Sequence, residues 1–254
     1  MVPTIDLNAD LGEGFGKSRS AEDQELLDLV SSANIACGFH AGDAVTMSDT
    51  VFAAKQRGVS IGAHPSYPDL PGFGRRELGL PPAQISFHVT AQLRALRDVC
   101  NAAGARMSYV KPHGALYNRA ARDAAAAEAI VAAVLSVDPD LALLGLPGSA
   151  IAAAAANKGI SFAGEAFIDR AYASDSTLVP RSESGALIED VDEAVERALV
   201  LARDHAVRAI TGERLSVEAQ SLCVHGDNPN AATLLRAVRN RLESSGFSIA
   251  RFRT

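Results

Sequence analysis

Short apolar runs alternate along the chain with longer segments of helical periodicity. Residues 46–57 carry apolar positions at helical spacing, and Gly58 and a short apolar run at residues 60–64 follow. Glycine directly after a helix is typical of a left-handed C-cap, because glycine adopts a positive φ without steric cost. The same order recurs at Gly104, Gly159 and Gly246. This repeated unit predicts a chain of alternating helices and strands.

Seven segments have the length and apolar composition of buried strands. They cover residues 5–10, 34–38, 61–64, 108–111, 141–146, 162–167 and 222–225, and residues 248–252 form a weaker eighth. Strands that alternate with helices predict a parallel sheet with right-handed crossovers. Seven or eight such units in 254 residues favour a TIM-like (β/α) barrel over an open doubly wound sheet. No linker divides the chain, so we expect residues 1–254 to form a single α/β barrel domain.

The composition narrows the classes of function. Lys and Arg number 24 against 30 Asp and Glu, and the net charge of -6 disfavours a nucleic-acid-binding protein, which carries a basic surface. The longest apolar runs are shorter than the roughly 18 residues of a membrane span, so we expect neither such a span nor a signal peptide. Cys37, Cys100 and Cys223 are odd in number and far apart, so we expect no disulfide framework and a cytoplasmic location.

Polar residues alternate with apolar ones in the first predicted strand. Asp6, Asn8 and Asp10 are two residues apart, so their side chains point to one face of that strand. A central barrel strand normally carries apolar residues on both faces, and neighbouring carboxylates raise each other's pKa. A solvated edge strand is the alternative, but similar residues recur at the ends of other strands, which favours a functional interpretation.

Histidines and charged residues follow the ends of the other predicted strands. They are His40, His64, Lys111 with His113, Glu165 with Asp169, and His225 with Asp227. The carboxyl ends of barrel strands meet at one mouth, where the active sites of this fold lie. We therefore predict one active site at this mouth. His88 and His205 fall within predicted helices, and we interpret them as structural.

Two segments without a strand pattern, residues 65–80 and 172–185, follow strand ends and are rich in Pro, Gly and Ser. Such loops often cover active sites. These loops and the end of the sixth predicted strand supply Arg75, Arg76, Arg170 and Arg181. Guanidinium groups bind carboxylates or phosphates through two hydrogen bonds. A solvated basic pair would explain the first two, but together the four indicate a small anionic substrate.

Two motifs indicate other chemistry less strongly. The segment GEGFGKS resembles a phosphate-binding loop, but the residue six positions before Lys17 is Leu11, where that pattern needs glycine. Cys37 and Cys223 each precede a histidine, which would suit a thiol nucleophile. A cysteine within a strand is more often a small buried hydrophobic residue, so neither motif determines the predicted function.

A metal site is a further alternative. Asp10, His40 and His64 are residue types that bind Zn²⁺ or another divalent ion. They lack the close spacing of a signature such as HExxH. We therefore leave a divalent metal open and assign no residue as a metal ligand.

These segments together resemble the LamB/YcsF family. The resemblance rests on DLNADLGEGFG, NIACGFHAGD, GAHPSYPDLPGFGRRE, VKPHGALYN, GEAFIDRAY, LVPRSESGALI and SLCVHGDN, in family order over almost the whole chain. It implies an irregular seven-stranded barrel similar to the glycoside hydrolase/deacetylase barrels, with no secure place for residues 248–252. It also implies the first of three components of an ATP-dependent 5-oxoprolinase, which opens 5-oxo-L-proline to L-glutamate together with subunits B and C.

On the basis of this resemblance, we assign hypothetical roles to the polar residues. The expected catalytic residues are Asp10, His40, His64, Lys111, His113 and His225, and the expected substrate-binding residues are Asn8, Glu13, Arg75, Arg76, Glu165, Asp169, Arg170, Arg181 and Asp227. Asp10 would be the general base for water, and Lys111 with His113 would stabilise negative oxygens. Glu165 and Asp169 would bind the ring nitrogen, the arginines would bind the carboxylate, and a carboxylate at position 227 would fix a histidine tautomer. ATP, the co-substrate, would bind mainly to the partner subunits.

Two alternatives stay open. A stand-alone, metal-dependent, deacetylase-like amidohydrolase would bind a divalent ion and act without ATP. A non-catalytic substrate-binding subunit would keep substrate binding and turnover after substitution of His40, His64 and His113. The polar strand faces argue against a purely structural role, because such groups are costly to bury. A homo-oligomer is compatible with each interpretation.

Overall fold

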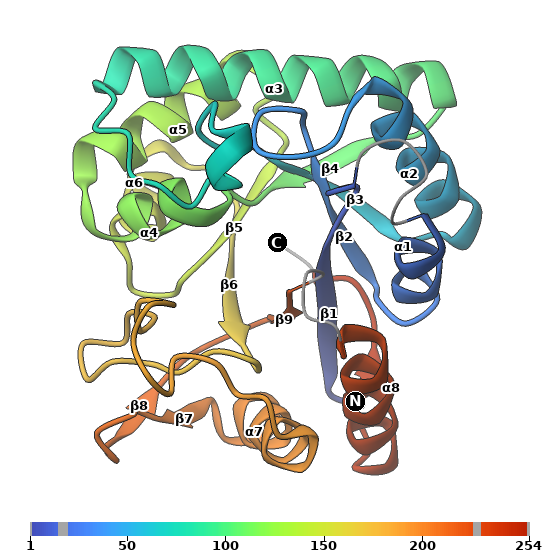
Figure 1. Cartoon of the computed structure of the whole chain (residues 1–254), viewed down its shortest axis with the longest axis vertical. Helices are drawn as coiled ribbons and strands as arrows, with labels where there is room; N and C mark the ends of the chain where they lie inside the picture. The colour runs from blue at the N-terminus through green and yellow to red at the C-terminus, as the bar shows by residue number, and fades with distance from the viewer. Residues whose placement is uncertain (1, 15–19, 226–229, 253–254) are drawn as a thin grey trace.

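The computed structural model describes residues 2–14, 20–225 and 230–252. Within these ranges, seven parallel strands close into a barrel (Figure 1). They are β1 (Thr4–Leu11), β2 (Ser32–Ala36), β3 (Ser60–His64), β4 (Met107–Val110), β5 (Ala142–Gly145), β6 (Phe162–Phe167) and β9 (Ser221–Val224). The strand β1 pairs with both β2 and β9, which closes the ring. The predicted α/β barrel of about seven parallel strands is confirmed.

Helices cover the outside of this barrel. They are α1 (Ser20–Leu27), α2 (Ala44–Arg57), α3 (Pro82–Ala103), α4 (Gly114–Arg122), α5 (Ala124–Val137), α6 (Ala150–Lys158), α7 (Val191–Asp204) and α8 (Ala231–Ser244). The helix α3 lies across the top of Figure 1 and packs against α2 and α5. Gly58, Gly104 and Gly159 adopt the left-handed conformation directly after α2, α3 and α6, as the repeated unit predicts. In the described ranges, no helix is long and apolar enough to cross a bilayer.

The eighth predicted strand lies outside the ring. The strand β10 (Ser248–Ile249) pairs in parallel with Thr4 and Ile5 at the start of β1. Beyond it, the ring of Phe252 contacts the ring of Tyr109 edge-on, with 5.1 Å between centroids. Together with Ala142, Leu144 and Ala163, these aromatic residues form a small separate apolar cluster. The C-terminal segment therefore packs against the barrel without forming one of its seven strands.

Two local features differ from the expectations. The antiparallel pair β7 (Ala206–Arg208) and β8 (Arg214–Ser216) was not predicted, because strands of three residues are too short to show an alternation. His205 is not helical: it follows α7 in the left-handed conformation, with φ of 48°. His88 lies within α3, as predicted.

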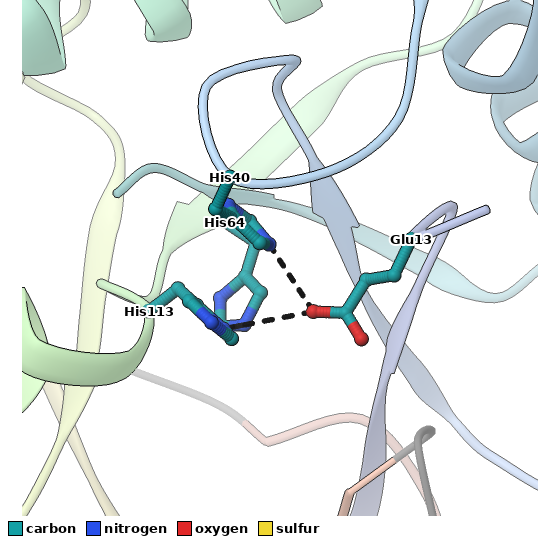
Figure 2. A group of neighbouring side chains, drawn as sticks. All are labelled: Glu13, His40, His64 and His113. Carbon is teal, nitrogen blue, oxygen red and sulfur yellow. Dashed lines mark hydrogen bonds and ion pairs between the residues drawn. The ribbon is translucent and has the colours of Figure 1, made fainter. Parts of the chain in front are cut away.

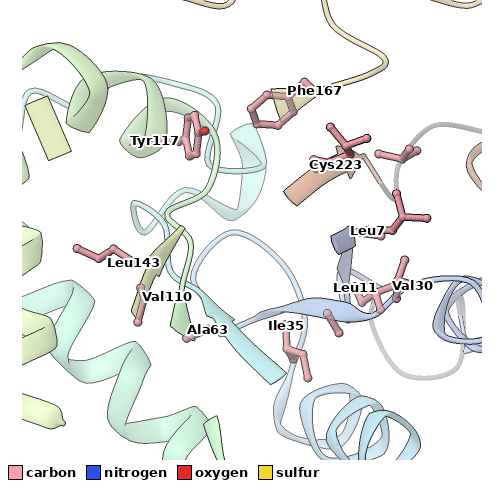
Figure 3. Close-up of a cluster of buried hydrophobic side chains, with 14 of the residues drawn as sticks. Leu7, Leu11, Val30, Ile35, Ala63, Val110, Tyr117, Leu143, Phe167 and Cys223 are labelled. Carbon is pink, nitrogen blue, oxygen red and sulfur yellow. The ribbon is translucent and has the colours of Figure 1, made fainter. Parts of the chain in front are cut away.

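The main apolar core lies between the strands and the helices. Figure 3 shows Leu7 and Leu11 of β1 beside Ile35 of β2, with Ala63 of β3 and Val110 of β4 further along the sheet. All five are fully buried. Because side chains alternate along a strand, Asp6, Asn8 and Asp10 point to the opposite face, the interior of the barrel.

The interior face of β1 is polar. Asp6, Asn8 and Asp10 are all buried, and their contacts confirm that they share one face. The side-chain amide of Asn34 in β2 donates to Asn8 Oδ1 at 2.7 Å and to Asp10 Oδ1 at 2.9 Å. The Tyr109 hydroxyl donates to Asn34 Oδ1 at 2.7 Å. Hydrogen bonds from β2 to β1 and from β4 to β2 therefore offset the cost of burying these groups.

Asp6 lies at the amino-terminal end of this polar face, away from the carboxyl ends of the strands. Its Oδ1 accepts hydrogen bonds from the hydroxyl groups of Ser31 and Ser32, both at 2.7 Å, and its Oδ2 accepts one from Ser221. Burial raises the pKa of Asp6 to about 6, although the three hydroxyl groups oppose the change. The carboxyl group therefore ionises within the folded protein at a higher pH than in the unfolded chain.

Because the folded state keeps this proton to a higher pH, stability should fall as the pH rises from about 4 to about 6. A change of about two pH units in the pKa corresponds to about 3 kcal/mol of unfolding free energy. Between about pH 4 and pH 7, the unfolding free energy of the wild-type chain should fall by about 3 kcal/mol more than that of Asp6→Asn. Urea unfolding at several pH values measures this difference. The exposed control Asp140→Asn should keep the wild-type pH dependence. Identical pH dependence of wild type and Asp6→Asn would contradict this assignment.

Candidate active site

A pocket of about 330 Å³ opens where the barrel strands end. Eight of the predicted site residues line it: Asp10, His64, Arg75, Lys111, His113, Arg170, Arg181 and His225. They come from the ends of β1, β3, β4, β6 and β9 and from the two loops predicted to cover the site. The fold thus brings residues that are more than 200 positions apart in the sequence into one pocket.

Lys111 lies at the centre of the charged groups. Its Nζ is 3.0 Å from Asp10 Oδ1, 2.8 Å from Glu165 Oε1 and 3.1 Å from Cys223 Sγ. Burial by itself lowers the pKa of Lys111, but the negative charges of Asp10 and Glu165 outweigh burial and hold this pKa well above its ordinary value. Lys111 is therefore a fully buried cation.

Asp10 is the carboxylate that connects Lys111 to the histidines. Its Oδ1 accepts from Lys111 Nζ and from Asn34 Nδ2, and it lies 3.3 Å from His64 Nε2. Burial favours the neutral carboxyl group, but the interactions with His64 and Lys111 outweigh burial and hold the pKa of Asp10 well below its ordinary value. The pocket wall therefore carries a permanently ionised carboxylate.

Three histidines gather beside Glu13 (Figure 2). His40 Nε2 is 3.1 Å and His113 Nδ1 is 3.6 Å from Glu13 Oε1. The rings of His40 and His113 are stacked, with 3.9 Å between centroids and 7° between planes. Burial lowers the pKa of His40, and it lowers that of His113 well below its ordinary value. These two imidazoles are therefore neutral at pH 7.

Asp169 and His225 form a second pair across the pocket. His225 Nδ1 lies 2.9 Å and 3.0 Å from the two carboxylate oxygens of Asp169, and the backbone N–H of His225 donates to Oδ2 at 3.1 Å. Burial favours the neutral form of Asp169, but His225 outweighs burial and lowers the Asp169 pKa. Asp227, which was expected to fix a histidine tautomer, lies outside the described residues. The carboxylate that holds His225 Nδ1 here is Asp169.

The four predicted arginines take different positions. Arg75, Arg170 and Arg181 line the pocket. The guanidinium of Arg76 instead donates from Nε to both carboxylate oxygens of Asp69, at 3.0 Å and 3.1 Å. Arg170 is buried, and burial lowers its pKa to about 10. Three arginines therefore line the space open to an anion. Arg76 instead stabilises the loop that carries Arg75, through its hydrogen bonds to Asp69.

The other predicted residues lie behind the pocket wall. Asn8 and Glu165 are completely buried and hold Lys111 from two sides. Glu13 and His40 support His113, and Asp169 supports His225. These residues orient the pocket-lining groups and do not line the pocket themselves.

Sequence reasoning missed several pocket-lining residues, among them Tyr117, Asn118 and Phe167. Glu165, Phe167 and Asp169 are each two residues apart, so their side chains share one face of the strand. The alternation of faces along this strand could therefore have identified Phe167 as a pocket residue. Its ring stacks on His225, with 5.2 Å between centroids, and Lys111 Nζ lies 5.3 Å from its centre. Phe167 therefore gives the pocket an apolar wall between two polar groups.

The cysteines match the buried hydrophobic interpretation. All three are buried, and none forms a disulfide. Burial raises the pKa of Cys37 to about 12 and holds that of Cys223 well above its ordinary value. Both side chains are therefore protonated thiols at pH 7, which makes them poor nucleophiles.

The sequence pattern of the LamB/YcsF family matches residues 5–254. The chain belongs to the LamB/YcsF family. A similar protein, the 5-oxoprolinase A subunit of Streptomyces avermitilis, is 53% identical over 248 residues, which are 98% of this chain and 99% of that protein. Among solved structures, a lactam utilization protein from Thermus thermophilus is 44% identical with a TM-score of 0.92 and covers 98% of this chain and 100% of its own.

The LamB/YcsF barrel has more distant structural neighbours. A family 4 carbohydrate esterase from Streptomyces lividans, solved with acetate, superposes with a TM-score of 0.50 over 99% of this chain and 93% of its own. The sequence identity is 12%, so this likeness shows the fold alone. The expected similarity to deacetylase barrels is thereby confirmed at the level of architecture.

A substitution at Gly74 would show how tightly the histidines of this LamB/YcsF site are packed. A Cβ at Gly74 would lie 2.1 Å from Ser66 Oγ, 2.8 Å from His40 Cβ and 2.9 Å from His113 Cδ2, at φ of +64°. Gly79 has φ of +61° with nothing within 4 Å of such a Cβ, so Gly79→Ala is a control for backbone strain alone. In urea unfolding, Gly74→Ala should lose about 1–3 kcal/mol more than Gly79→Ala, because only the former displaces buried groups. Equal losses would show that the histidines are not confined by this loop.

Proposed function

We propose that this chain is the A component of an ATP-dependent 5-oxoprolinase, which hydrolyses the lactam 5-oxo-L-proline to L-glutamate together with subunits B and C. The observation that carries the proposal is one pocket that combines an ionised Asp10–Lys111 pair with three arginines. The names of two relatives, a 5-oxoprolinase component and a lactam utilization protein, support the substrate class.

The pocket suits a small, anionic, cyclic amide. Its volume of about 330 Å³ is at the lower end of the range for small-molecule sites. Arg75, Arg170 and Arg181 would bind the substrate carboxylate, because guanidinium groups match its two oxygens. The methylene groups of the ring would pack against Phe167, an apolar part of the wall.

The chemistry explains why ATP is needed. A lactam is a stable amide with a poor leaving group, so the carbonyl oxygen is first phosphorylated by ATP, which releases ADP. Water then adds to the ring carbon, and the C–N bond breaks as the nitrogen takes up a proton. This cleavage leaves an acyl phosphate, which a second water hydrolyses to L-glutamate and inorganic phosphate. Loss of phosphate before C–N cleavage would only regenerate the lactam.

The described residues suit the hydrolytic part of this sequence. Asp10 would take the proton of the attacking water through Oδ2, since the described donors contact Oδ1. Its low pKa keeps it ionised, and a weak base is sufficient because phosphorylation makes the ring carbon strongly electrophilic. Lys111 would stabilise negative charge on the oxygens, whereas the N–H of His113 is held by the carbonyl oxygen of Phe73. His225, held by Asp169, would deliver a proton to the ring nitrogen.

The proposal assigns the phosphoryl transfer mainly to subunits B and C. Leu11 occupies the position of the first glycine in the phosphate-loop pattern of residues 11–18. The cytoplasm would supply ATP and would keep the three buried thiols reduced.

The test uses the reconstituted three-subunit enzyme with 5-oxoproline and ATP. Asp10→Asn should lower the turnover number for glutamate release by about 100-fold or more, because the variant cannot accept the proton of water. Asp140→Asn, an exposed carboxylate outside the pocket, should retain wild-type turnover. Near-wild-type glutamate formation by Asp10→Asn would remove Asp10 from the mechanism.

The same assay separates the alternatives. Glutamate release by this chain alone, without ATP or partners, would favour a stand-alone amidohydrolase and contradict the proposal. Full turnover by a complex with Asp10→Asn and Lys111→Met substitutions would favour a non-catalytic, substrate-binding role.

A further inference from the structure

Four buried side chains with metal-binding atoms converge beside the pocket (Figure 2). One ligand atom from each of Glu13, His40, His64 and His113 lies within 4.8 Å of the other three. They come from different segments: the chain after β1, the loop after β2, the last residue of β3 and the residue before α4. The fold therefore assembles this cluster from positions that no local motif connects.

Backbone carbonyl groups fix the tautomers of two of these histidines. His64 Nδ1 is 2.8 Å from the carbonyl oxygen of Lys111, and His113 Nε2 is 2.9 Å from that of Phe73. A carbonyl oxygen only accepts hydrogen bonds, so each of these ring nitrogens carries a hydrogen. Metal-binding histidines are commonly oriented by such hydrogen bonds from the opposite nitrogen.

The remaining nitrogens of these two rings face each other. His64 Nε2 and His113 Nδ1 are 3.0 Å apart, and both present lone pairs in the neutral tautomers that the carbonyl groups fix. Two lone pairs at this distance repel each other unless a positively charged species lies beside both. A proton would bridge these two nitrogens, with Asp10 Oδ1 3.3 Å from His64 Nε2, whereas a metal ion would also bind Glu13 and His40, whose ligand atoms lie within 4.8 Å.

Three of the donor-atom spacings are close to those of a tetrahedral metal site, and all four atoms lie within 4.8 Å of one another. Ligands about 2.0–2.2 Å from Zn²⁺ in tetrahedral geometry lie about 3.3–3.6 Å from one another. The contacts here are 3.0 Å from His64 to His113, 3.1 Å from His40 to Glu13, and 3.6 Å from His113 to Glu13. Imidazole and carboxylate are also the ligand types that suit Zn²⁺.

We propose that Glu13, His40, His64 and His113 bind one divalent transition-metal ion, with Zn²⁺ as the best match. Asp10 Oδ1 connects this site to the charged pair of Lys111 and Glu165, because it lies 3.3 Å from His64 Nε2 and 3.0 Å from Lys111 Nζ. His64 and His113 also line the pocket, so the ion would add positive charge beside the proposed anion site. The inference does not depend on the proposed function, since metal binding is measured without substrate, ATP or partners.

The test measures metal binding to the full chain without an affinity tag. Protein stripped with a chelator and dialysed against metal-free buffer is loaded with Zn²⁺ and, separately, with Co²⁺. After removal of excess metal, elemental analysis should give about one equivalent of Zn²⁺ per chain, and Co²⁺ should show the visible absorption of a tetrahedral site. Thermal unfolding should shift to higher temperature upon loading, because the ion binds only the folded cluster.

Variants locate the ion. Glu13→Gln keeps the shape of the side chain but removes its charge, and His40→Gln removes one imidazole; each should weaken Zn²⁺ binding by at least about 10–100-fold. His205→Asn is the matched control, because it removes a histidine outside the cluster and asparagine tolerates the left-handed backbone there. This control should bind Zn²⁺ like the wild-type chain.

Two results would overturn the proposal. Folded wild-type chain that retains almost no metal after loading would show that the cluster holds only a shared proton. Equal Zn²⁺ affinity of wild type, Glu13→Gln and His40→Gln would place the ion elsewhere. The first result needs no variant, so misfolding of a variant leaves the test decisive.

Discussion

The buried ammonium group of Lys111 is the interaction on which the site depends. It lies within 3.0 Å of Asp10 and Glu165, and all three side chains are almost completely buried. Without this cation, two carboxylates would share a water-poor interior, where one of them would have to take up a proton. With it, the ends of β1, β4 and β6 are tied together across the barrel, and Asp10 stays ionised at the pocket.

The rest of the site follows from this charge arrangement. The hydrogen-bonded interior face of β1 holds Asp10 in place, and the apolar residues on its other face bind the strand to the helices. The loops after β3 and β6 then add arginines to the pocket, and Phe167 adds an apolar wall. A stable barrel wall with chemically variable loops is the general division of labour in this fold, and here the polar groups reach into the barrel itself.

Strand alternation predicts much of this architecture, because it depends on neighbours in the sequence. It places Asp10 on the interior face and identifies the mouth of the barrel as the site. It does not predict that Arg76 pairs with Asp69, since that pairing depends on the turn at Leu70–Gly72. Nor does it predict that Asp169 holds His225. The paired strands β6 and β9 are separated in the sequence by α7, β7 and β8, so no local pattern connects these two residues. Local patterns thus identify the groups, and the closed topology determines their partners.

A double-mutant cycle on Lys111 and Glu165 tests the central claim most directly. The unfolding free energies of wild type, Lys111→Met, Glu165→Gln and the double variant would be measured by urea unfolding at pH 7. Removal of the cation alone should cost about 3–5 kcal/mol, because it leaves buried charges unpaired. Glu165→Gln in the Lys111→Met background should restore part of this loss, with a coupling energy of at least about 1 kcal/mol. A coupling energy near zero would contradict the view that this ion pair stabilises the site.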